Sequence, residues 1–288
     1  MSRVLGRVSE AVRSQRCILF LGAGVHAPPP EGSPFVYPPE HRPPVGAALS
    51  RQLAAECDFA ARFAGEDVGN LQRVALAYEI DGSRGRLVNA ITRAVDAGRA
   101  PSPMLSALAR LSFPLVITTN YDQLFERALR DAGKHPRVSV YRPEDEPTVD
   151  FEDETAQSPV IYKLHGDITQ RESLVVTDED YIQFVLRMSD KEPYDPIPLS
   201  LKHFLKRWTT LFVGYSLLDY NLRLLFKTLR WRIDAAKVPD MYSVDLRPDP
   251  LILDVWQSQH RYVTFIAQDV WSFVPALYQL VRGQELAP

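Results

Sequence analysis

The stretch CILFLGAG, residues 17–24, joins a short apolar run to a glycine turn. A run of this length followed by Gly-x-Gly is typical of a buried strand that ends in a tight turn, where backbone N–H groups can approach a phosphate. Glycine suits any turn, so Gly22 and Gly24 are weak evidence alone. The complete dinucleotide-binding fingerprint G-x-G-x-x-G is absent, because Pro28 and its neighbours stand where the third glycine and its helix would be.

Further apolar runs follow this strand and alternate with segments whose apolar residues recur every three or four positions. The alternation predicts an α/β fold in which a parallel sheet is buried on both faces by amphipathic helices. We expect a doubly wound sheet that binds its ligand at the carboxyl ends of the strands. The expected strands are 17–21, 114–120, 160–164, 173–177, 210–214, 241–245 and 262–266. The expected helices outside the region between the first two strands are 3–15, 103–110, 122–133, 178–188, 198–207, 219–234, 250–260 and 270–282.

The composition changes twice between the first two strands. Residues 25–44 are rich in proline, which disfavours both a helix and a central strand and predicts a long loop. From residue 45 to about residue 96 the periodicity is helical, which predicts a small helical layer. We expect a single domain over residues 1–288, with a helical module at about 45–110 inserted into the sheet core. The acidic, proline-punctuated segment 141–159 is expected to be a surface connection.

The whole-chain composition narrows the class of protein. The 288 residues are 45% hydrophobic, enough for a substantial core, and the formal net charge of −3 gives no general attraction for nucleic acid or acidic membranes. No apolar run approaches the roughly 18 to 20 residues of a membrane helix, and the N-terminus lacks a secretory pattern, so we expect a cytoplasmic protein. Cys17 and Cys57 are the only cysteines, which excludes a zinc ribbon.

Polar residues gather at the ends of several expected strands, in TTNYD at 118–122, LHGD at 164–167 and GYSLLDYN at 214–221. Because the ends of parallel strands converge on one crevice, these segments and the GAG turn should meet there. Asn120 or Asp122 alone could be an ordinary N-cap of the next helix. His165 alone could be a structural histidine, or a base whose pKa suits neutral pH. Their convergence on one crevice favours a functional site.

The ordered set LGAGV, ITTNYDQLFE, YKLHGD and LFVGYSLLDYNLR, spread over about residues 17–225, resembles the sirtuin-like family. It resembles in particular the bacterial sirtuin-like domains of anti-phage defence proteins. Each motif is modest alone, and the set is specific. The resemblance implies a Rossmann-like sheet with a smaller helical module, binding of NAD, and cleavage of the bond between nicotinamide and ribose.

Matched position by position, the resemblance implies a role for each polar strand end. Asn120 corresponds to the asparagine beside the nicotinamide ribose, Asp122 to the aspartate that holds the carboxamide, and His165 to the base. Asp245 is expected at the adenine ribose. The full set of cofactor-binding residues implied in this way is Gly22, Ala23, Gly24, Thr118, Gly214, Ser216 and Asp245.

The chain also departs from the family pattern. His26 stands where the family has serine after GAGV, and the proline-rich loop replaces the segment that follows. The paired cysteines of zinc-bearing, deacylating members are missing, so we expect no zinc module, no bound metal, and water instead of acyl-lysine as the acceptor. The expected activity is hydrolysis of NAD to nicotinamide and ADP-ribose. The alternatives are a non-catalytic NAD or ADP-ribose sensor, a zinc-free deacylase or ADP-ribosyltransferase, and a structural interaction module.

Expected partners rest on the resemblance. Defence members of the family act by depleting NAD in abortive infection, and they stay silent until an oligomer, a partner or an infection signal activates them. The resemblance therefore implies a homo-oligomer and a separate sensing protein, such as an ATPase, a helicase-like protein or an Argonaute-type protein. Direct contact with nucleic acid or membrane is not expected.

Overall fold

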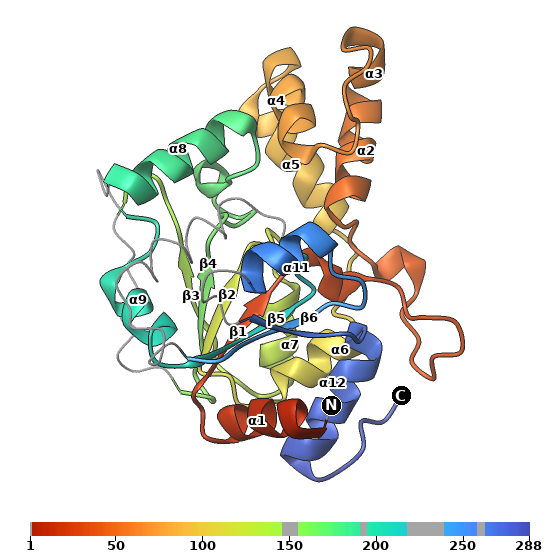
Figure 1. Cartoon of the computed structure of the whole chain (residues 1–288). Helices are drawn as coiled ribbons and strands as arrows, with labels where there is room; N and C mark the ends of the chain where they lie inside the picture. The colour runs from red at the N-terminus through yellow and green to blue at the C-terminus, as the bar shows by residue number, and fades with distance from the viewer. Residues whose placement is uncertain (1, 146–154, 191–194, 218–238, 258–262) are drawn as a thin grey trace.

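The fold is built on one parallel sheet in the computed structural model, which describes residues 2–145, 155–190, 195–217, 239–257 and 263–288 (Figure 1). Within these ranges the seven-stranded sheet has the order β3-β4-β2-β1-β5-β6-β7, and all neighbouring strands are parallel. The strands are β1 (Cys17–Leu21), β2 (Leu115–Thr118), β3 (Arg137–Val140), β4 (Val160–Lys163), β5 (Thr209–Val213), β6 (Met241–Val244) and β7 (Val263–Ile266). The predicted doubly wound sheet is confirmed, with its switch point between β1 and β5.

Helices cover both faces of the sheet, because successive side chains along a buried strand point to opposite faces. Leu19 and Leu21 of β1 belong to the core on one face, and Ile18 and Phe20 belong to the core on the other. The first face packs against α1 (Ser2–Arg13), α6 (Pro103–Ala109), α7 (Leu124–Asp131) and α12 (Val270–Arg282). The second packs against α8 (Asp178–Asp190), α9 (Leu199–Leu205) and α11 (Pro250–Gln257). No helix among the described residues has the length and apolarity required to cross a membrane.

A third hydrophobic core belongs to a helical module, which Figure 1 shows beyond one end of the sheet and next to α8. The module consists of α2 (Gly46–Glu56), α3 (Phe59–Arg62), α4 (Leu71–Asp81) and α5 (Arg84–Val95). Asn70 and Ser83 cap the starts of α4 and α5, where their side-chain oxygens accept backbone N–H groups of the first turns. α6 belongs instead to the core of the sheet, so the compact part of the module ends with α5.

The predicted strand at 173–177 is wrong. Residues 174–176 join no ladder of the sheet, and the Val175 N–H donates to the His165 carbonyl at 3.0 Å. Leu174 and Val176 pack into the module core, whereas Val175 packs into a sheet core. The alternation of apolar side chains therefore bridges two cores, which produces the same sequence pattern as a strand.

Other differences concern the edge of the sheet and its surroundings. The strand β3 was not predicted, because Arg137 and Ser139 interrupt its apolar run and it lies at the edge, paired with β4. The predicted helix at 219–234 lies outside the described residues, as do parts of the predicted segments 141–159 and 250–260.

The proline-rich segment is a folded part of the structure with aromatic anchors. It contains two short 3-10 helices, η1 (Ala23–His26) and η2 (Pro39–His41). Phe35 and Tyr37 are buried, and their ring centroids lie 6.2 and 6.3 Å from that of Trp271 on α12. The Tyr37 hydroxyl donates to the Ala100 carbonyl at 2.9 Å, and the Trp271 indole N–H donates to the Ala27 carbonyl at 3.2 Å. Side chains thus hold a segment whose prolines cannot join a hydrogen-bonded ladder.

Candidate active site

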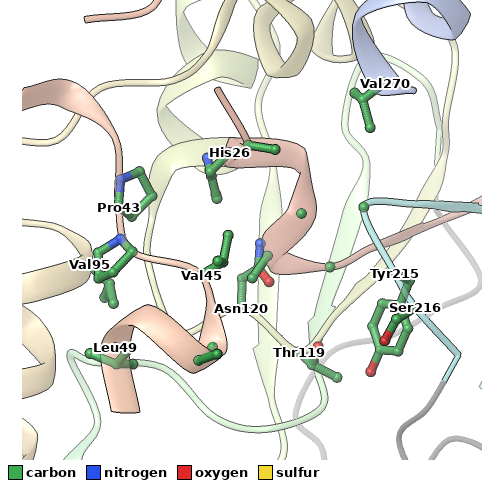
Figure 2. Close-up of a pocket in the computed structure, with 18 of the residues that line it drawn as sticks. His26, Pro43, Val45, Leu49, Val95, Thr119, Asn120, Tyr215, Ser216 and Val270 are labelled. Carbon is green, nitrogen blue, oxygen red and sulfur yellow. The ribbon is translucent and has the colours of Figure 1, made fainter. Parts of the chain in front are cut away.

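A cavity of about 850 Å³ lies at the carboxyl ends of β1, β2, β5 and β6, where the strand order switches. Its volume is typical of small-molecule and cofactor sites. The residues singled out by sequence that line it are Gly22, Ala23, Gly24, Asn120, Asp122, His165, Gly214, Ser216 and Asp245. In Figure 2, Thr119 and Ser216 lie on the sheet side of this cavity, and Pro43, Leu49 and Val95 lie on the side of the proline-rich segment and the module.

The floor of the cavity is a close contact between the GAG turn after β1 and Gly214 after β5. The Gly24 N–H donates to the Gly214 carbonyl at 2.9 Å, and the Gly22 N–H donates to the Val213 carbonyl at 3.0 Å. A Cβ on Gly22 would lie 2.4 Å from the Gly214 oxygen. Gly214 has a φ of +70°, and a Cβ there would lie 2.2 Å from the Val25 nitrogen. Any side chain at these positions would clash, so the glycine floor has a packing reason besides its place in the cavity.

Asn120 is held at the end of β2 by Thr118. The buried Thr118 hydroxyl donates to the Leu21 carbonyl of β1 at 3.0 Å and accepts the Asn120 N–H at 3.0 Å. Thr118 does not line the cavity, whereas its neighbour Thr119 does. The contribution of Thr118 to the site is therefore to tie two strands together and to fix the main chain of Asn120.

Asp122 has both a local and a cavity-facing contact. Its Oδ1 accepts the Leu124 N–H at 2.9 Å, two residues along the chain, which is an Asx turn just before α7, and Gln123, not Asp122, is the N-cap residue. Its Oδ2 lies 3.6 Å from Nε2 of His26, which is also buried and lines the cavity. Burial acts to raise the pKa of Asp122, but His26, Lys163 and the Leu124 N–H outweigh burial and lower the pKa below its usual value. Asp122 is therefore a carboxylate at neutral pH.

His165 follows β4 and is 3% exposed, yet it lines the cavity. Its Nδ1 lies 3.5 Å from the Tyr181 hydroxyl, and its ring meets Tyr181 and Phe184 edge to face, with centroids 5.3 and 5.6 Å away. Gly166 has a φ of +87°, and a Cβ there would lie 2.2 Å from the Ser173 carbonyl oxygen. The chain thus turns sharply after His165, and aromatic rings from α8 fix the imidazole at the cavity wall.

Lys163 organises a buried charge network that sequence reasoning missed. Its side chain is fully buried, and its ammonium lies 2.6 Å from a carboxylate oxygen of Asp167 and 3.1 Å from one of Glu126. It also donates to the main-chain carbonyls of Asp122 at 2.5 Å and Tyr121 at 3.3 Å. Burial acts to lower the pKa of Lys163, but the two carboxylates outweigh burial and raise the pKa. The signal available in the sequence was a charged residue inside an apolar strand.

The network places Asp167 away from the cavity, although it belongs to the LHGD motif. Its Oδ1 accepts the N–H and the hydroxyl of Thr169 at 2.8 and 2.6 Å, while its Oδ2 holds Lys163. Lys163 in turn holds the loop that carries Asn120 and Asp122. Within the described ranges, no group of three or more His, Cys, Asp or Glu side chains is arranged to hold a metal ion.

Comparison with known proteins identifies relatives of this chain. A family model described as a SIR2-like domain matches residues 114–264, about half of the chain. An NAD(+) hydrolase ThsA from Enterococcus faecium is 35% identical over 127 residues, covering 43% of this chain and 24% of that protein. An NAD(+) hydrolase ThsA from Acinetobacter baumannii is 26% identical over 230 residues, covering 79% of this chain and 42% of that protein.

A third relative is the Defense-associated sirtuin 2 of Bacillus subtilis, which is 30% identical over 118 residues. That match covers 40% of this chain and 10% of that protein, so the chain spans less than half the length of each of these relatives. The family match begins just before β2 and ends within β7, and it therefore includes Asn120, Asp122 and His165. The chain belongs to the SIR2-like domain family.

Proposed function

We propose that this domain hydrolyses NAD at the bond between nicotinamide and ribose. The observation that carries the proposal is the meeting of the glycine floor, Asn120, Asp122 and His165 in one cavity at the switch point of the sheet. Residues separated by more than a hundred positions converge there without any packing requirement that explains all of them. Relatives named NAD(+) hydrolases support the choice of substrate.

The chemistry needs three kinds of assistance. The bond between C1′ of the ribose and the pyridinium nitrogen breaks, its electron pair neutralises the ring nitrogen, and nicotinamide leaves. Water adds to the oxocarbenium-like C1′ and gives up a proton, so that the products are ADP-ribose, nicotinamide and a proton. In our proposal Asp122 holds the carboxamide, Asn120 positions the water, and His165 accepts the proton directly or through a ribose hydroxyl.

The rest of the cavity would bind the remainder of NAD. The glycine floor suits the pyrophosphate because no side chain projects from Gly22, Gly24 or Gly214, so a bulky group can approach the backbone closely, while the Gly22 and Gly24 N–H groups hold the floor together. We assign Ser216 to the phosphates and Asp245, which directly follows β6, to the adenine ribose, because both line the same cavity and a carboxylate can accept a ribose hydroxyl. Ala23 lies between the two glycines of the turn and lines the same cavity.

The proposed biological role is depletion of NAD in the cytoplasm during anti-phage defence. Its support is the similarity to a protein named Defense-associated sirtuin and to NAD(+) hydrolases. We further propose a homo-oligomer and a separate sensing partner, because an NAD hydrolase without control would harm its own cell.

The test is a product assay on the purified chain. Nicotinamide and ADP-ribose are quantified after incubation with NAD, with and without an acyl-lysine peptide. Asn120→Ala and His165→Ala should each lower turnover by about 100- to 10,000-fold, because each removes a group that acts on the reacting atoms. His203→Ala, which changes an exposed histidine on α9, is the matched control and should keep full turnover.

The other outcomes separate the alternatives. Nicotinamide release that requires the peptide would indicate a deacylase or an ADP-ribosyltransferase. Binding of NAD without turnover, measured by calorimetry on the same samples, would indicate a sensor. Full turnover by His165→Ala would contradict the assignment of the base.

A further inference from the structure

His26 is a buried histidine whose hydrogen-bonding capacity the described residues leave unused. It ends η1, is 3% exposed, and lines the cavity. Neither Nδ1 nor Nε2 has a hydrogen-bond partner among the described residues, because the nearest carboxylate oxygen, on Asp122, is 3.6 Å from Nε2 and so beyond hydrogen-bond distance. A buried polar group without a partner is costly, so a polar ligand atom at this wall would relieve an existing deficit.

The chemistry of the two side chains defines the ligand group. Asp122 as a carboxylate only accepts hydrogen bonds, whereas a ring nitrogen of His26 that carries a proton donates one. A ligand group that satisfies both must offer a donor and an acceptor side by side. A primary carboxamide does so, since its oxygen and nitrogen are only about 2.2 Å apart given the lengths of the C=O and C–N bonds. A gap of 3.6 Å between Nε2 and Oδ2 lets the two edges of one amide reach both partners.

The surroundings of His26 suit a flat aromatic ring that bears such an amide. Figure 2 shows His26 on η1 with Asn120 and Val45 below it and Pro43 to one side. Pro28 and Val95 also line this cavity, so its wall combines apolar side chains with the polar pair.

We propose that His26 is a substrate-binding residue that donates a hydrogen bond to the carboxamide oxygen of nicotinamide, while Asp122 accepts one from the carboxamide nitrogen. This inference rests on the proposed function for the identity of the substrate. It adds a residue that sets specificity for the pyridine substituent. The reaction at C1′ is unchanged, and His26 takes no proton in it.

The experiment compares NAD with thionicotinamide adenine dinucleotide, in which a poorly accepting sulfur replaces the carboxamide oxygen. His26→Leu should raise KM for NAD roughly tenfold, because a hydrogen bond to the substrate is lost. The same substitution should change KM for the thio analogue by less than about twofold, because there is little hydrogen bond to lose. His26→Gln, whose amide nitrogen can stand in for Nε2, should restore KM for NAD to within about threefold of the original value.

The ratio of KM for NAD to KM for the thio analogue is measured within one folded variant. A general loss of activity therefore does not change this ratio. If His26→Leu fails to fold, His26→Asn replaces it, because its amide is too short to reach the ligand. An equal rise in KM for NAD and for the thio analogue would overturn the proposal. His26 would then act through the structure or on another part of the dinucleotide.

Free nicotinamide and thionicotinamide, titrated calorimetrically, separate this proposal from the proposed function. His26→Leu could weaken the binding of nicotinamide and leave the binding of thionicotinamide unchanged while no NAD is hydrolysed. In that case the carboxamide subsite is supported and the hydrolase assignment fails. If NAD is hydrolysed with no difference between the analogues, the hydrolase assignment stands and the subsite fails.

Discussion

Two buried lysines show that the groups around a buried charge determine whether it stabilises the fold. Lys163 lies between the carboxylates of Glu126 and Asp167, and its pKa is raised. Lys134 is also buried and donates to the Leu111 carbonyl, but burial and the like charge of Arg282 lower its pKa to about 8. In the sequence only Lys163 stands out, because it follows the apolar run of a strand. A buried charge is favourable where opposite charges surround it, and unfavourable where a carbonyl alone receives it.

The same substitution should therefore have opposite effects at the two sites. Lys163→Met should lower the free energy of unfolding by about 3 to 5 kcal/mol, because it leaves two buried carboxylates without their cation. Lys134→Met should leave stability at pH 7 unchanged or raised. The folded pKa of Lys134 lies below that of the unfolded chain, so the unfolded state binds more protons and wild-type stability rises between pH 8 and 10.5.

Urea unfolding at pH 7 and at pH 10.5 measures these effects. The advantage of Lys134→Met over the wild type should shrink at the higher pH, where the wild-type lysine is neutral in the folded state and about half of the unfolded chains have lost its charge. An advantage that does not depend on pH would contradict the lowered pKa. A neutral effect of Lys163→Met at pH 7 would show that the carboxylates find other partners.

At the scale of single elements, the proline-rich segment is the part of the site most dependent on long-range contacts. Its prolines supply no ladder hydrogen bonds. The segment is held instead by the contacts of Phe35 and Tyr37 with Trp271. Beyond these anchors, Pro43, Pro44 and Val45 line the cavity. The position of this wall therefore depends on Phe35 and Tyr37, which do not line the cavity, and on Trp271, which does.

Tyr37→Ala should loosen the wall without unfolding the sheet. It removes a buried ring and the hydrogen bond to Ala100, so backbone amides over residues 31–46 should exchange with deuterium at least about tenfold faster, and KM for NAD should rise. Val36→Ala is the matched control, because Val36 is the next residue along the chain and is 77% exposed. Equal exchange in the two variants would mean that other contacts fix the segment.

The elements also show what the sequence could and could not predict. The parallel sheet and its polar strand ends were predictable, because apolar runs and their abrupt ends are local patterns. β3 was not, since an edge strand with Arg137 and Ser139 has little local signal. The segment 174–176 mimicked a strand because it alternates between two cores. The roles of Lys163 and of the Asp122 contact with His26 depend on residues distant in sequence, so no local pattern contains them.

At the scale of the whole molecule, the cavity lies between bodies with separate hydrophobic cores. The sheet supplies the polar residues, and the module supplies part of the opposite wall. Arg84 of α5 joins the two, because its guanidinium lies 2.8 Å from Asp180 of α8 and 3.0 Å from Glu79 of α4, and it also donates to the Leu174 carbonyl. The geometry of the cavity is therefore sensitive to a contact remote from it.

Arg84→Met should raise Kd for NAD about tenfold and increase deuterium exchange in α4 and α5, because the module loses its charged tie to α8. Arg93→Met is the control on the same helix, since Arg93 is exposed and pairs with Glu56 within the module at 3.4 Å. Surface pairs of this kind contribute little, so its Kd should stay within about twofold of the wild-type value. Equal effects of the two substitutions would show that the module is held mainly by its apolar contacts.

The glycine floor has a consequence for how ligands come and go. Because the turns after β1 and β5 are hydrogen-bonded to each other and pack backbone against backbone, a dinucleotide could pass between them only by breaking these contacts. Among the described residues, we therefore expect entry and product release on the other side, past the prolines and the module. A partner that closes or opens that side would control turnover without contacting the reacting atoms.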